Sequence, residues 1–325
     1  MKHISIMVPV GAALSGIEVS RHILTEVNDY MESMGKRHLF HIQLVGATDT
    51  VKLNGNLFTI HPDATIHTLK KTDLIIIPAI HVSLEKNVAA NAPLISWITD
   101  QYYKGSEIAS LCVGAFLLAK TGLLDGRKCT THWKAADIFK DMYPGIELVK
   151  DRIITDEQGI YSSGGGMSLL NLLLYIIEKY AGRETAIYCA KFFQVDIDRT
   201  AQLPFIIFQA QKNHGDEHVR KAQEYIEMNY QQKITADQIA SMVSIGKRSL
   251  ERRFKKATDN TLKEYIQRVK IEAAKKQLET GNKKINDVMY DVGYVDNKTF
   301  RNSFKTVTGL LPNEYRNKYN KHVIA

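Results

Sequence analysis

The chain has 325 residues, of which 44% are hydrophobic and 24% are charged, a composition that is ordinary for a soluble globular protein. Its length predicts two domains. No window reaches the roughly 18 apolar residues of a membrane span, and the first residues lack the pattern of a signal peptide. We therefore expect a cytoplasmic protein with no membrane partner.

The three cysteines, Cys112, Cys129 and Cys189, are too few for a disulfide framework and suit a reducing compartment. They have no Cys-x-x-Cys spacing that would suggest zinc. We predict no metal site and no cofactor.

The net charge of +8 is unevenly distributed. Residues 211–325 hold 23 Lys and Arg against 14 Asp and Glu, which is +9, and residues 1–210 hold 20 against 21, which is −1. A basic region beside a neutral one indicates a polyanionic partner for the basic part. A solvated basic surface is the alternative.

Apolar, β-branched runs alternate with helical patterns in the first two thirds of the chain. Strands buried on both faces and separated by helices predict a doubly wound α/β fold with a parallel sheet. The predicted strands are 4–9, 41–47, 74–78, 108–111 and 160–163, and the predicted helices are 18–34, 94–103, 113–120 and 169–180.

One junction in this region has the pattern of a nucleophile elbow. A strand runs directly into a helix, with Cys112 at the turn and the small residues Gly114 and Ala115 just after it. Such a turn exposes its side chain at the carboxyl edge of the sheet, and a helix N-terminus is expected to lower the thiol pKa. His132 is the candidate base. A buried, inert cysteine is the alternative interpretation of the same pattern.

Residues 110–133 and the Tyr-Ser-Ser-Gly-Gly-Gly segment at 161–166 resemble the DJ-1/PfpI group of the class I glutamine-amidotransferase-like superfamily, in particular the version fused to AraC-type regulators. The resemblance covers about residues 3–205 and implies a flavodoxin-like fold. It implies a nucleophile at Cys112 and an assisting His132. Paired glycines are often found where this chain has Ala79, Ile80 and His81.

These departures favour a sensory domain in which catalysis is not required. We therefore predict no catalytic residue beyond the candidates Cys112 and His132, and a pocket for a small-molecule effector. The predicted pocket residues are Glu18, Ile80, His81, Cys112, Val113 and His132.

Helical patterns fill the last third of the chain. Residues 218–230 predict an entry helix, and Thr235 with Gln238 has the capping-box spacing. A turn at 244–246 then leads into a helix at 247–256, whose Leu250 and Phe254 face inward. This pattern predicts a first helix-turn-helix motif.

A long helix over 261–279 is predicted to join this motif to a second one. The second motif begins at Ile285, turns at Gly293, where positive φ is expected, and continues in a helix capped by Asp296 or Asn297. Phe300 and Phe304 face inward from that helix.

The region 217–318 resembles the AraC-type DNA-binding domain, and its Gly-x-x-Pro-x-x-Tyr-Arg segment is formed by Gly309, Pro312, Tyr315 and Arg316. Asp259 stands where the family commonly has Gly, and Leu262 where it commonly has Pro. Two recognition helices on one connector suit adjacent major-groove segments about one turn (~34 Å) apart.

Side chains on the outward faces of the two recognition helices are the predicted DNA contacts. Arginine pairs with guanine, asparagine with adenine, and glutamate accepts from cytosine. The predicted base contacts are Arg248, Glu251, Arg252, Asn297, Lys298, Arg301 and Asn302, and the predicted phosphate contacts are Lys247, Lys255, Lys256 and Lys305.

The sequence thus predicts a DJ-1/PfpI-like sensor domain at 1–207, a linker at 208–216 and an AraC-type DNA-binding domain at 217–325. Residues 205–211, which span the end of the sensor domain and the start of the linker, are either a last strand or a docking segment. The predicted function is a sequence-specific transcription regulator that binds double-stranded DNA, responds to a small molecule and forms a homodimer. One alternative is a cysteine-dependent amidase, hydrolase or glyoxalase-like enzyme tethered to a DNA-binding module, and another is an RNA-binding or nucleoid protein.

Overall fold

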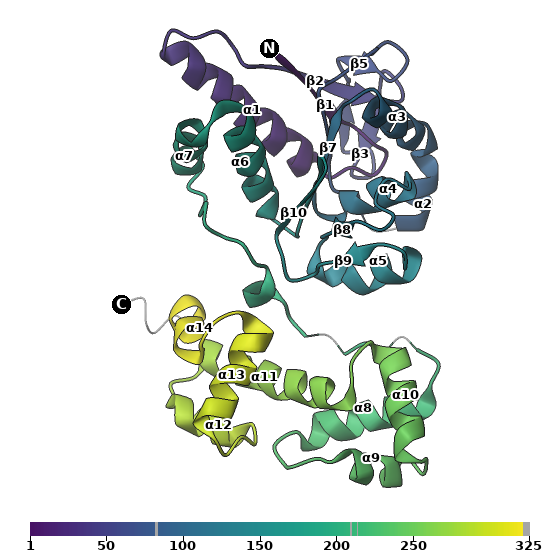
Figure 1. Cartoon of the computed structure of the whole chain (residues 1–325), viewed down its shortest axis with the longest axis vertical. Coiled ribbons are helices and arrows are strands. Elements are labelled where there is room, and N and C mark those ends of the chain that lie inside the picture. The colour runs from purple at the N-terminus through teal and green to yellow at the C-terminus, as the bar shows by residue number, and fades with distance from the viewer. Residues whose placement is uncertain (82–83, 209, 213, 321–325) are drawn as a thin grey trace. The chain divides into compact units, whose positions relative to one another are not determined.

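The computed structural model describes residues 1–81, 84–208, 210–212 and 214–320. The chain divides into two compact units, Met1–Gln202 and Leu203–Ala325. Each unit has cores of its own. Figure 1 shows an α/β unit followed by an all-helical one.

The first unit is built on a seven-stranded sheet with the strand order β10-β11-β7-β6-β1-β2-β5. All neighbouring strands are parallel except β10 and β11, which are antiparallel. Ile4 and Ile6 of β1 pair with Leu74 and Ile76 of β6 in the centre of the sheet. These central strands are apolar throughout because helices cover both faces.

Two hydrophobic cores lie on opposite faces of this sheet. One core packs α1, α6 and α7 against one face, and the other packs α3 and α4 against the other face (Figure 1). Alternation along β6 shows the division, since Leu74 and Ile76 belong to the first core and Ile75 and Ile77 to the second. The doubly wound α/β fold predicted from the sequence is confirmed.

The elements of this unit have the following bounds. The strands are β1 Lys2–Met7, β2 Phe40–Gly46, β3 Val51–Leu53, β4 Phe58–Ile60, β5 Ala64–Thr65, β6 Leu74–Ile77, β7 Glu107–Ser110, β8 Lys128–Cys129, β9 Glu147–Leu148, β10 Ile154–Glu157 and β11 Ile160–Ser163. The helices are α1 Leu14–Ser33, α2 Leu84–Ala90, α3 Ala92–Tyr103, α4 Ala115–Lys120, α5 Ala136–Met142, α6 Ser168–Ala181 and α7 Arg183–Phe192, with short 3₁₀ turns η1 Cys112–Gly114 and η2 Trp133–Ala135.

Every strand and helix predicted for this unit is present, with ends shifted by a few residues. The elements that the sequence analysis missed are short or polar. They include the β3–β4 hairpin, β8 with β9, and the edge strand β10. A two- or three-residue strand has too few side chains to show an alternating pattern.

The second unit contains seven α-helices among the described residues. They are α8 Glu217–Asn229, α9 Ala236–Met242, α10 Lys247–Thr258, α11 Leu262–Thr280, α12 Ile285–Asp291, α13 Asn297–Thr308 and α14 Pro312–Tyr319, preceded by the 3₁₀ turn η3 Leu203–Phe205. One core is formed by α8, α9, α10 and the start of α11, and a second by the rest of α11 with α12, α13 and α14. The connector α11 contributes to both cores, so it is shared by two small bundles.

The predicted caps of this unit are present. Thr235 and Gln238 form the predicted capping box at the start of α9. Thr261 and Glu264 form a further box, which was not predicted, at the start of α11. Of the two candidates for capping α13, Asp296 holds the position, because its carboxylate accepts the Thr299 N–H at 2.7 Å. Gly293 has the expected positive φ, at +74°.

The segment between the units packs onto the helical one. No strand forms in the described part of 205–211. Phe208 lies edge-on to Tyr265 with ring centres 5.2 Å apart, so the docking alternative holds for this residue. The predicted bounds of domains and linker stay predictions, and residues 209, 213 and 321–325 of those ranges lie outside the described residues.

In the described part of the chain, no helix combines the length and apolar character needed to cross a membrane.

Candidate nucleic-acid interface and thiol site

Two helix-turn-helix motifs with the same internal geometry form the helical unit. We call α9 with α10 the first reading unit and α12 with α13 the second reading unit. The fourth residue of α10 and of α13, Leu250 and Phe300, is fully buried, and so is the eighth, Phe254 and Phe304. The motifs are therefore structural repeats that bury one face of each recognition helix.

The repeat extends to the ends of the recognition helices. Thr258 and Thr308 are the last residues of α10 and α13, and each hydroxyl donates to the carbonyl four residues earlier at 2.8 Å. Each helix then ends on a left-handed residue, Asp259 at φ +54° and Gly309 at φ +76°. The same local hydrogen bonds therefore stop both helices at the same length.

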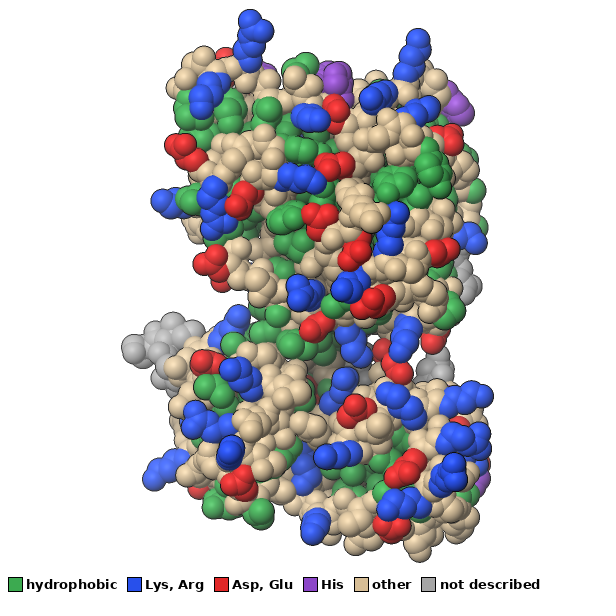
Figure 2. Space-filling model, viewed as in Figure 1, with side chains coloured by type: hydrophobic (Ala, Val, Ile, Leu, Met, Phe, Trp, Pro, Cys, Tyr) green, Lys and Arg blue, Asp and Glu red, His purple; other side chains and the backbone are tan. Residues whose placement is uncertain are grey.

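The predicted base contacts lie on the faces opposite the cores. All seven side chains are exposed, and they come from only two helices, α10 and α13. Lys and Arg side chains gather over the α10 end of the helical unit on the face seen in Figure 2. The helix α10 therefore presents cations and one carboxylate to solvent, and α13 presents cations and amides, which are groups that can bind base edges and phosphates.

The four lysines predicted to contact phosphates differ in their surroundings. Lys247 pairs with Asp237 of α9 at 2.9 Å. The Lys255 ammonium donates to the backbone oxygen of Asp259 at 2.7 Å. Lys256 and Lys305 are exposed. The charges of the first two are therefore partly used within the unit, and the latter two remain the better candidates.

A buried lysine of α11 joins the loop that leads into α9 to the turn of the second reading unit. Lys270 of α11 donates to the backbone oxygen of Gly293 at 2.9 Å and to that of Gln232 at 3.4 Å. It also lies 5.4 Å from the ring centre of Tyr294. Burial lowers the pKa of Lys270. One side chain thus joins the loop before α9 to the turn between α12 and α13.

The thiol site lies where β7 leads into η1 and α4. Cys112 has φ +55° and is only 9% exposed. A side chain at Gly114 would have its Cβ 2.6 Å from the backbone oxygen of Pro78, so the turn admits only glycine there. The predicted requirement for a small residue beside the cysteine is confirmed by this close approach.

The expected lowering of the thiol pKa is wrong. Burial raises the pKa of Cys112, and backbone N–H groups of Gly166 and Val113 offset only part of that rise. The helix that follows the turn, α4, has six residues, and a helix this short has only a weak dipole. Loss of hydration therefore outweighs the helix N-terminus at this thiol.

His132 is held by groups other than the thiol. Its Nδ1 accepts the Lys134 N–H at 3.0 Å, and its ring packs so closely on Gly165 that a Cβ there would overlap it. Burial, together with the charge of Lys134, lowers the pKa of His132. The imidazole is therefore neutral near pH 7, and the role of a base toward Cys112 stays a prediction.

The other predicted pocket residues have distinct environments. Glu18 is exposed and bound by the guanidinium of Arg21 at 2.9 Å, which holds its pKa below the ordinary value. Ile80 is buried, and its neighbour His81 donates its backbone N–H to Gly11 at 2.7 Å. Val113 is half-buried in η1. Their joint membership in one ligand pocket stays a prediction.

Polar residues that the sequence analysis missed hold the thiol loop. The backbone N–H of Cys112 donates to Ser163 Oγ at 3.1 Å, and its carbonyl accepts from Thr131 Oγ1 at 2.9 Å. The buried Gln202 donates to the Thr131 carbonyl at 3.1 Å, and it accepts the Gly165 N–H at 3.4 Å. Gln202 is also the last residue of the first unit, so the chain leaves that unit beside the thiol loop.

Comparison with known proteins agrees with this architecture. Residues 24–179 match the DJ-1/PfpI family, and residues 239–318 match a helix-turn-helix domain family. The first unit therefore carries a DJ-1/PfpI domain and the second an AraC-type helix-turn-helix domain, the combination of a DNA-binding transcriptional regulator.

The individual relatives include regulators and an enzyme. The HTH-type transcriptional regulator CdhR of Pseudomonas aeruginosa is 25% identical over 280 residues, which cover 86% of this chain and 82% of that protein. Isonitrile hydratase of Pseudomonas putida is 27% identical over 111 residues, 34% of this chain and 46% of that enzyme. A crystal structure from Vibrio parahaemolyticus, described as a transcriptional regulator protein, is 26% identical with a TM-score of 0.53, over 59% of this chain and 98% of the other.

Proposed function

We propose that the chain regulates transcription by inserting α10 and α13 into adjacent major-groove segments of one specific DNA duplex. The observation that carries this proposal is the repeat of two exposed recognition helices around a shared connector, α11. To enter two adjacent major-groove segments at once, the two recognition helices must be held at a fixed distance and orientation. The contacts of Lys270 with the loop that leads into α9 and with the turn between α12 and α13 support such a relation.

Base reading in this proposal is assigned to the exposed residues of the recognition helices. Arg248 and Arg252 of α10 have the donors for guanine, and Asn302 of α13 has the donor and acceptor for adenine. Glu251 has the acceptor for cytosine. Lys256 and Lys305 contribute to affinity through phosphates, and this contribution weakens with salt.

The N-terminal unit is proposed to bind a small-molecule effector near Cys112 and to form the homodimer contact, which would place four reading helices on one operator. Gln202, directly before the chain enters the helical unit, donates to the carbonyl of Thr131, whose hydroxyl donates to the carbonyl of Cys112. This connection supports a sensory role for the loop. The cytoplasmic location predicted from the sequence goes with this proposal, because the DNA lies there.

The decisive experiment is selection of genomic DNA fragments by the full chain, followed by affinity measurements on the selected duplex. Arg252→Ala is expected to weaken binding by roughly 1–3 kcal/mol and to relax selectivity at one base pair. Its control is the neighbouring Arg253, which is half-buried and donates two hydrogen bonds to Asp216 at 2.7 Å. Arg253→Ala should lower stability without changing which base is preferred.

Failure to enrich any sequence would contradict the proposal, and equal losses by Arg252→Ala on all sequences would reassign this residue to a phosphate. The effector is tested separately by calorimetric titration of the full chain with candidate metabolites. If no metabolite binds, and Cys112→Ala leaves regulation of a reporter gene unchanged, the sensory role is wrong.

The enzyme alternative is supported by the similarity to isonitrile hydratase and by the strand–turn–helix position of Cys112. The raised pKa of Cys112 speaks against a reactive thiolate at neutral pH. Measuring the alkylation rate against pH, with Cys112→Ala as the control, separates the two. A sensor thiol reacts only above the ordinary cysteine pKa, whereas an enzyme thiolate reacts well below it.

A further inference from the structure

A polar hollow lies between the two helices of the second reading unit, α12 and α13, and the helix that follows them, α14. Its volume is about 400 Å³, near the lower end of small-molecule pockets. Six of its eight lining residues are cations or amides, and none of the eight is a carboxylate. They are Lys284, Arg301, Arg316, Asn286, Asn297 and Asn313.

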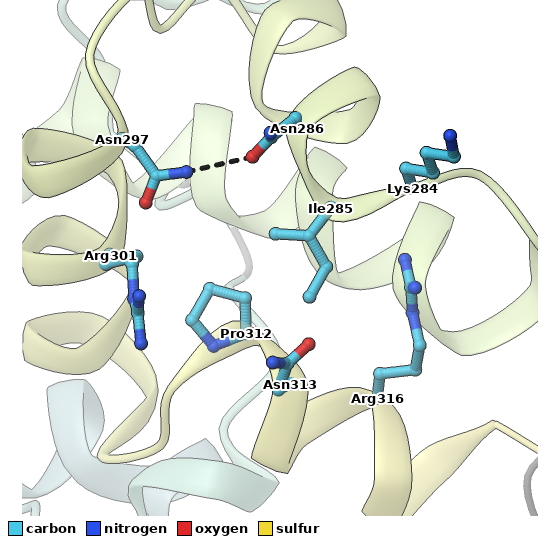
Figure 3. A pocket seen from close by; sticks show the side chains of 8 residues that line it. All are labelled: Lys284, Ile285, Asn286, Asn297, Arg301, Pro312, Asn313 and Arg316. Atoms are coloured by element: carbon cyan, nitrogen blue, oxygen red, sulfur yellow. Dashed lines mark hydrogen bonds between the residues drawn. The ribbon is translucent and has the colours of Figure 1, made fainter.

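Figure 3 shows how these side chains surround the hollow, with Ile285 and Pro312 between them. Asn297 donates to Asn286 across one side at 2.8 Å, which fixes the start of α13 against the start of α12. Arg301 borders the hollow from α13, and Arg316 borders it from α14 on the opposite side. The cations thus approach one space from different helices.

The hydrogen bonding of Arg316 is incomplete. One of its terminal nitrogens donates to the backbone oxygen of Lys283 at 2.6 Å. Its Nε is buried and has no hydrogen-bond partner among the described residues. Because that atom is closed to solvent, Arg316 can act on an occupant of the hollow through its charge and its terminal nitrogens and not through Nε.

The first reading unit shows that this chemistry is not a general property of the scaffold. The positions equivalent to Asn286, Arg301 and Arg316 are the second residue of α9, the fifth of α10 and the fifth of α11. Those positions hold Asp237, Glu251 and Ile266. Asp237 pairs with Lys247 at 2.9 Å, where the second unit has its Asn286–Asn297 bond.

The positions equivalent to Asn297 and Asn313 hold the cations Lys247 and Lys263. Charges of both signs therefore occur at the first site, and only cations occur at the second. The start of α14 adds to the difference. This helix has eight residues, and Asn313 is its second residue, where unpaired N–H groups favour an anion. Three cations, three amides and the lack of a carboxylate among the lining residues together indicate an anionic occupant.

We propose that the hollow binds one phosphate group of the DNA backbone beside the groove that α13 enters. This inference rests on the proposed function and sharpens it. It assigns Arg301 and Asn297 to the phosphate and leaves base reading in α13 to Lys298 and Asn302. The second reading unit then positions the duplex, whereas the first unit, with Glu251 in place of Arg301, contributes more to sequence choice.

Asn313→Asp in the full chain is the central test. An acidic residue in the first turn of α14 suits the helix dipole, so the fold is expected to be at least as stable. A carboxylate in the hollow repels phosphate. We expect weaker binding on the selected duplex and on unrelated duplexes alike, with the slope of log K against log salt reduced in magnitude by about 0.9.

The matched control is Asn317→Asp, the same change at an exposed position of the same helix. It alters net charge equally and should keep the salt slope. A second variant, Arg316→Gln, should reproduce the loss of slope. Its melting temperature is measured alongside, because a purely structural Arg316 would lower stability and leave the slope unchanged.

Duplexes with single methylphosphonate substitutions locate the phosphate. One position should weaken binding of the unmodified chain and have no further effect on Asn313→Asp. Absence of any such position, or equal salt slopes for Asn313→Asp and Asn317→Asp, overturns the inference. Inorganic phosphate that binds the free chain while Asn313→Asp binds DNA normally would identify a site for a free anion and also overturn it. If the unmodified chain selects no duplex, the proposed function itself fails.

Discussion

The two reading units have the same buried framework and different chemistry at the turns and on the surface. Leu250 and Phe254 in the first unit correspond to Phe300 and Phe304 in the second, and all four are fully buried. The left-handed residue of the turn is Ser244 in the first unit and Gly293 in the second. Repetition of the core keeps the recognition helices equivalent, while the exposed positions are free to differ.

The difference at the turn has a physical cause. A Cβ at Gly293 would overlap the backbone oxygen of Gln231 and lie 2.7 Å from the Lys270 ammonium. Ser244, in contrast, is exposed. The second turn is therefore packed against α11 and the loop before α9, whereas the first turn is exposed at Ser244. Glycine is required at one of two equivalent positions because of packing, since both positions have positive φ.

Exchanging the residues of the two turns should give the largest effect. Gly293→Ser is expected to destabilise the helical unit by roughly 2–5 kcal/mol, because it combines left-handed strain with overpacking. Ser244→Gly relieves left-handed strain at an exposed position and should stabilise the unit by roughly 0.5–1 kcal/mol. Urea unfolding followed by far-ultraviolet circular dichroism measures both.

Tryptophan fluorescence provides the control for this experiment. Both tryptophans, Trp97 and Trp133, lie in the first unit, so their unfolding transition should not move. Equal destabilisation by the two exchanges would contradict the packing difference between the turns.

Removing the ammonium of Lys270 should have the next largest effect. Lys270→Met leaves the backbone oxygens of Gln232 and Gly293 without this donor, and we expect a loss of roughly 1–3 kcal/mol in unfolding free energy. Affinity for the selected duplex should fall more than affinity for a duplex holding only one of the two contacted segments. Lys276→Met, an exposed change on the same helix, is the control and should affect neither.

The Asp216–Arg253 pair belongs to the first reading unit's bundle and should give a moderate, pH-dependent effect. Hydrogen bonding from Arg253 lowers the pKa of Asp216. The Asp216 carboxylate also caps α8. The side chains are 21% and 32% exposed, so we expect Asp216→Asn to lose only about 1 kcal/mol at neutral pH. Asparagine keeps the cap and removes the charge.

The sign of the pH dependence follows from the lowered pKa. The stabilisation from Asp216 is complete above the unfolded-state pKa, about 3.9, and is lost as the pH falls through the lower folded-state value. Unfolding curves of the original chain and of Asp216→Asn should therefore converge in strong acid. A difference that persists there would mean that charge pairing is not its cause.

The smallest effect is expected where the recognition helices end. Asp259→Gly removes a side chain from a left-handed position that has glycine in the second unit, and should stabilise the chain by roughly 0.5–1 kcal/mol. Thermal unfolding measures this gain, and Gly309→Asp is the mirror variant, expected to be destabilising. A loss for Asp259→Gly would show that contacts of Asp259 with Lys255 outweigh the backbone strain.

Much of the helical unit could be predicted from sequence because its signals are local. Each of these signals lies within a few residues of the feature that it determines. They are the capping residues, the apolar spacing of Phe300 and Phe304, and the glycine of the second turn. The hollow was missed for the opposite reason. Its residues come from three helices, and Arg316 was noted only as part of the terminal motif.

In the N-terminal unit, the strand–turn–helix position of Cys112 could be predicted, and the state of its thiol could not. A helix N-terminus is visible in the sequence, but burial depends on the loops that cover the turn. Those loops are held by Ser163, Thr131 and Gln202, which are distant in sequence from one another. No pattern along the chain joins them.

The hydrogen bonds of the buried Lys270 to Gly293 and Gln232 also limit which DNA sites the chain can bind. Because a buried contact sets the spacing of the two recognition helices, a point mutation in an operator costs one contact at a time. Insertion of a single base pair between the two contacted segments rotates one of them by roughly 34–36° relative to the other. Operators of this chain are therefore expected to drift by substitution while keeping their length, so alignments of its sites should need no gaps.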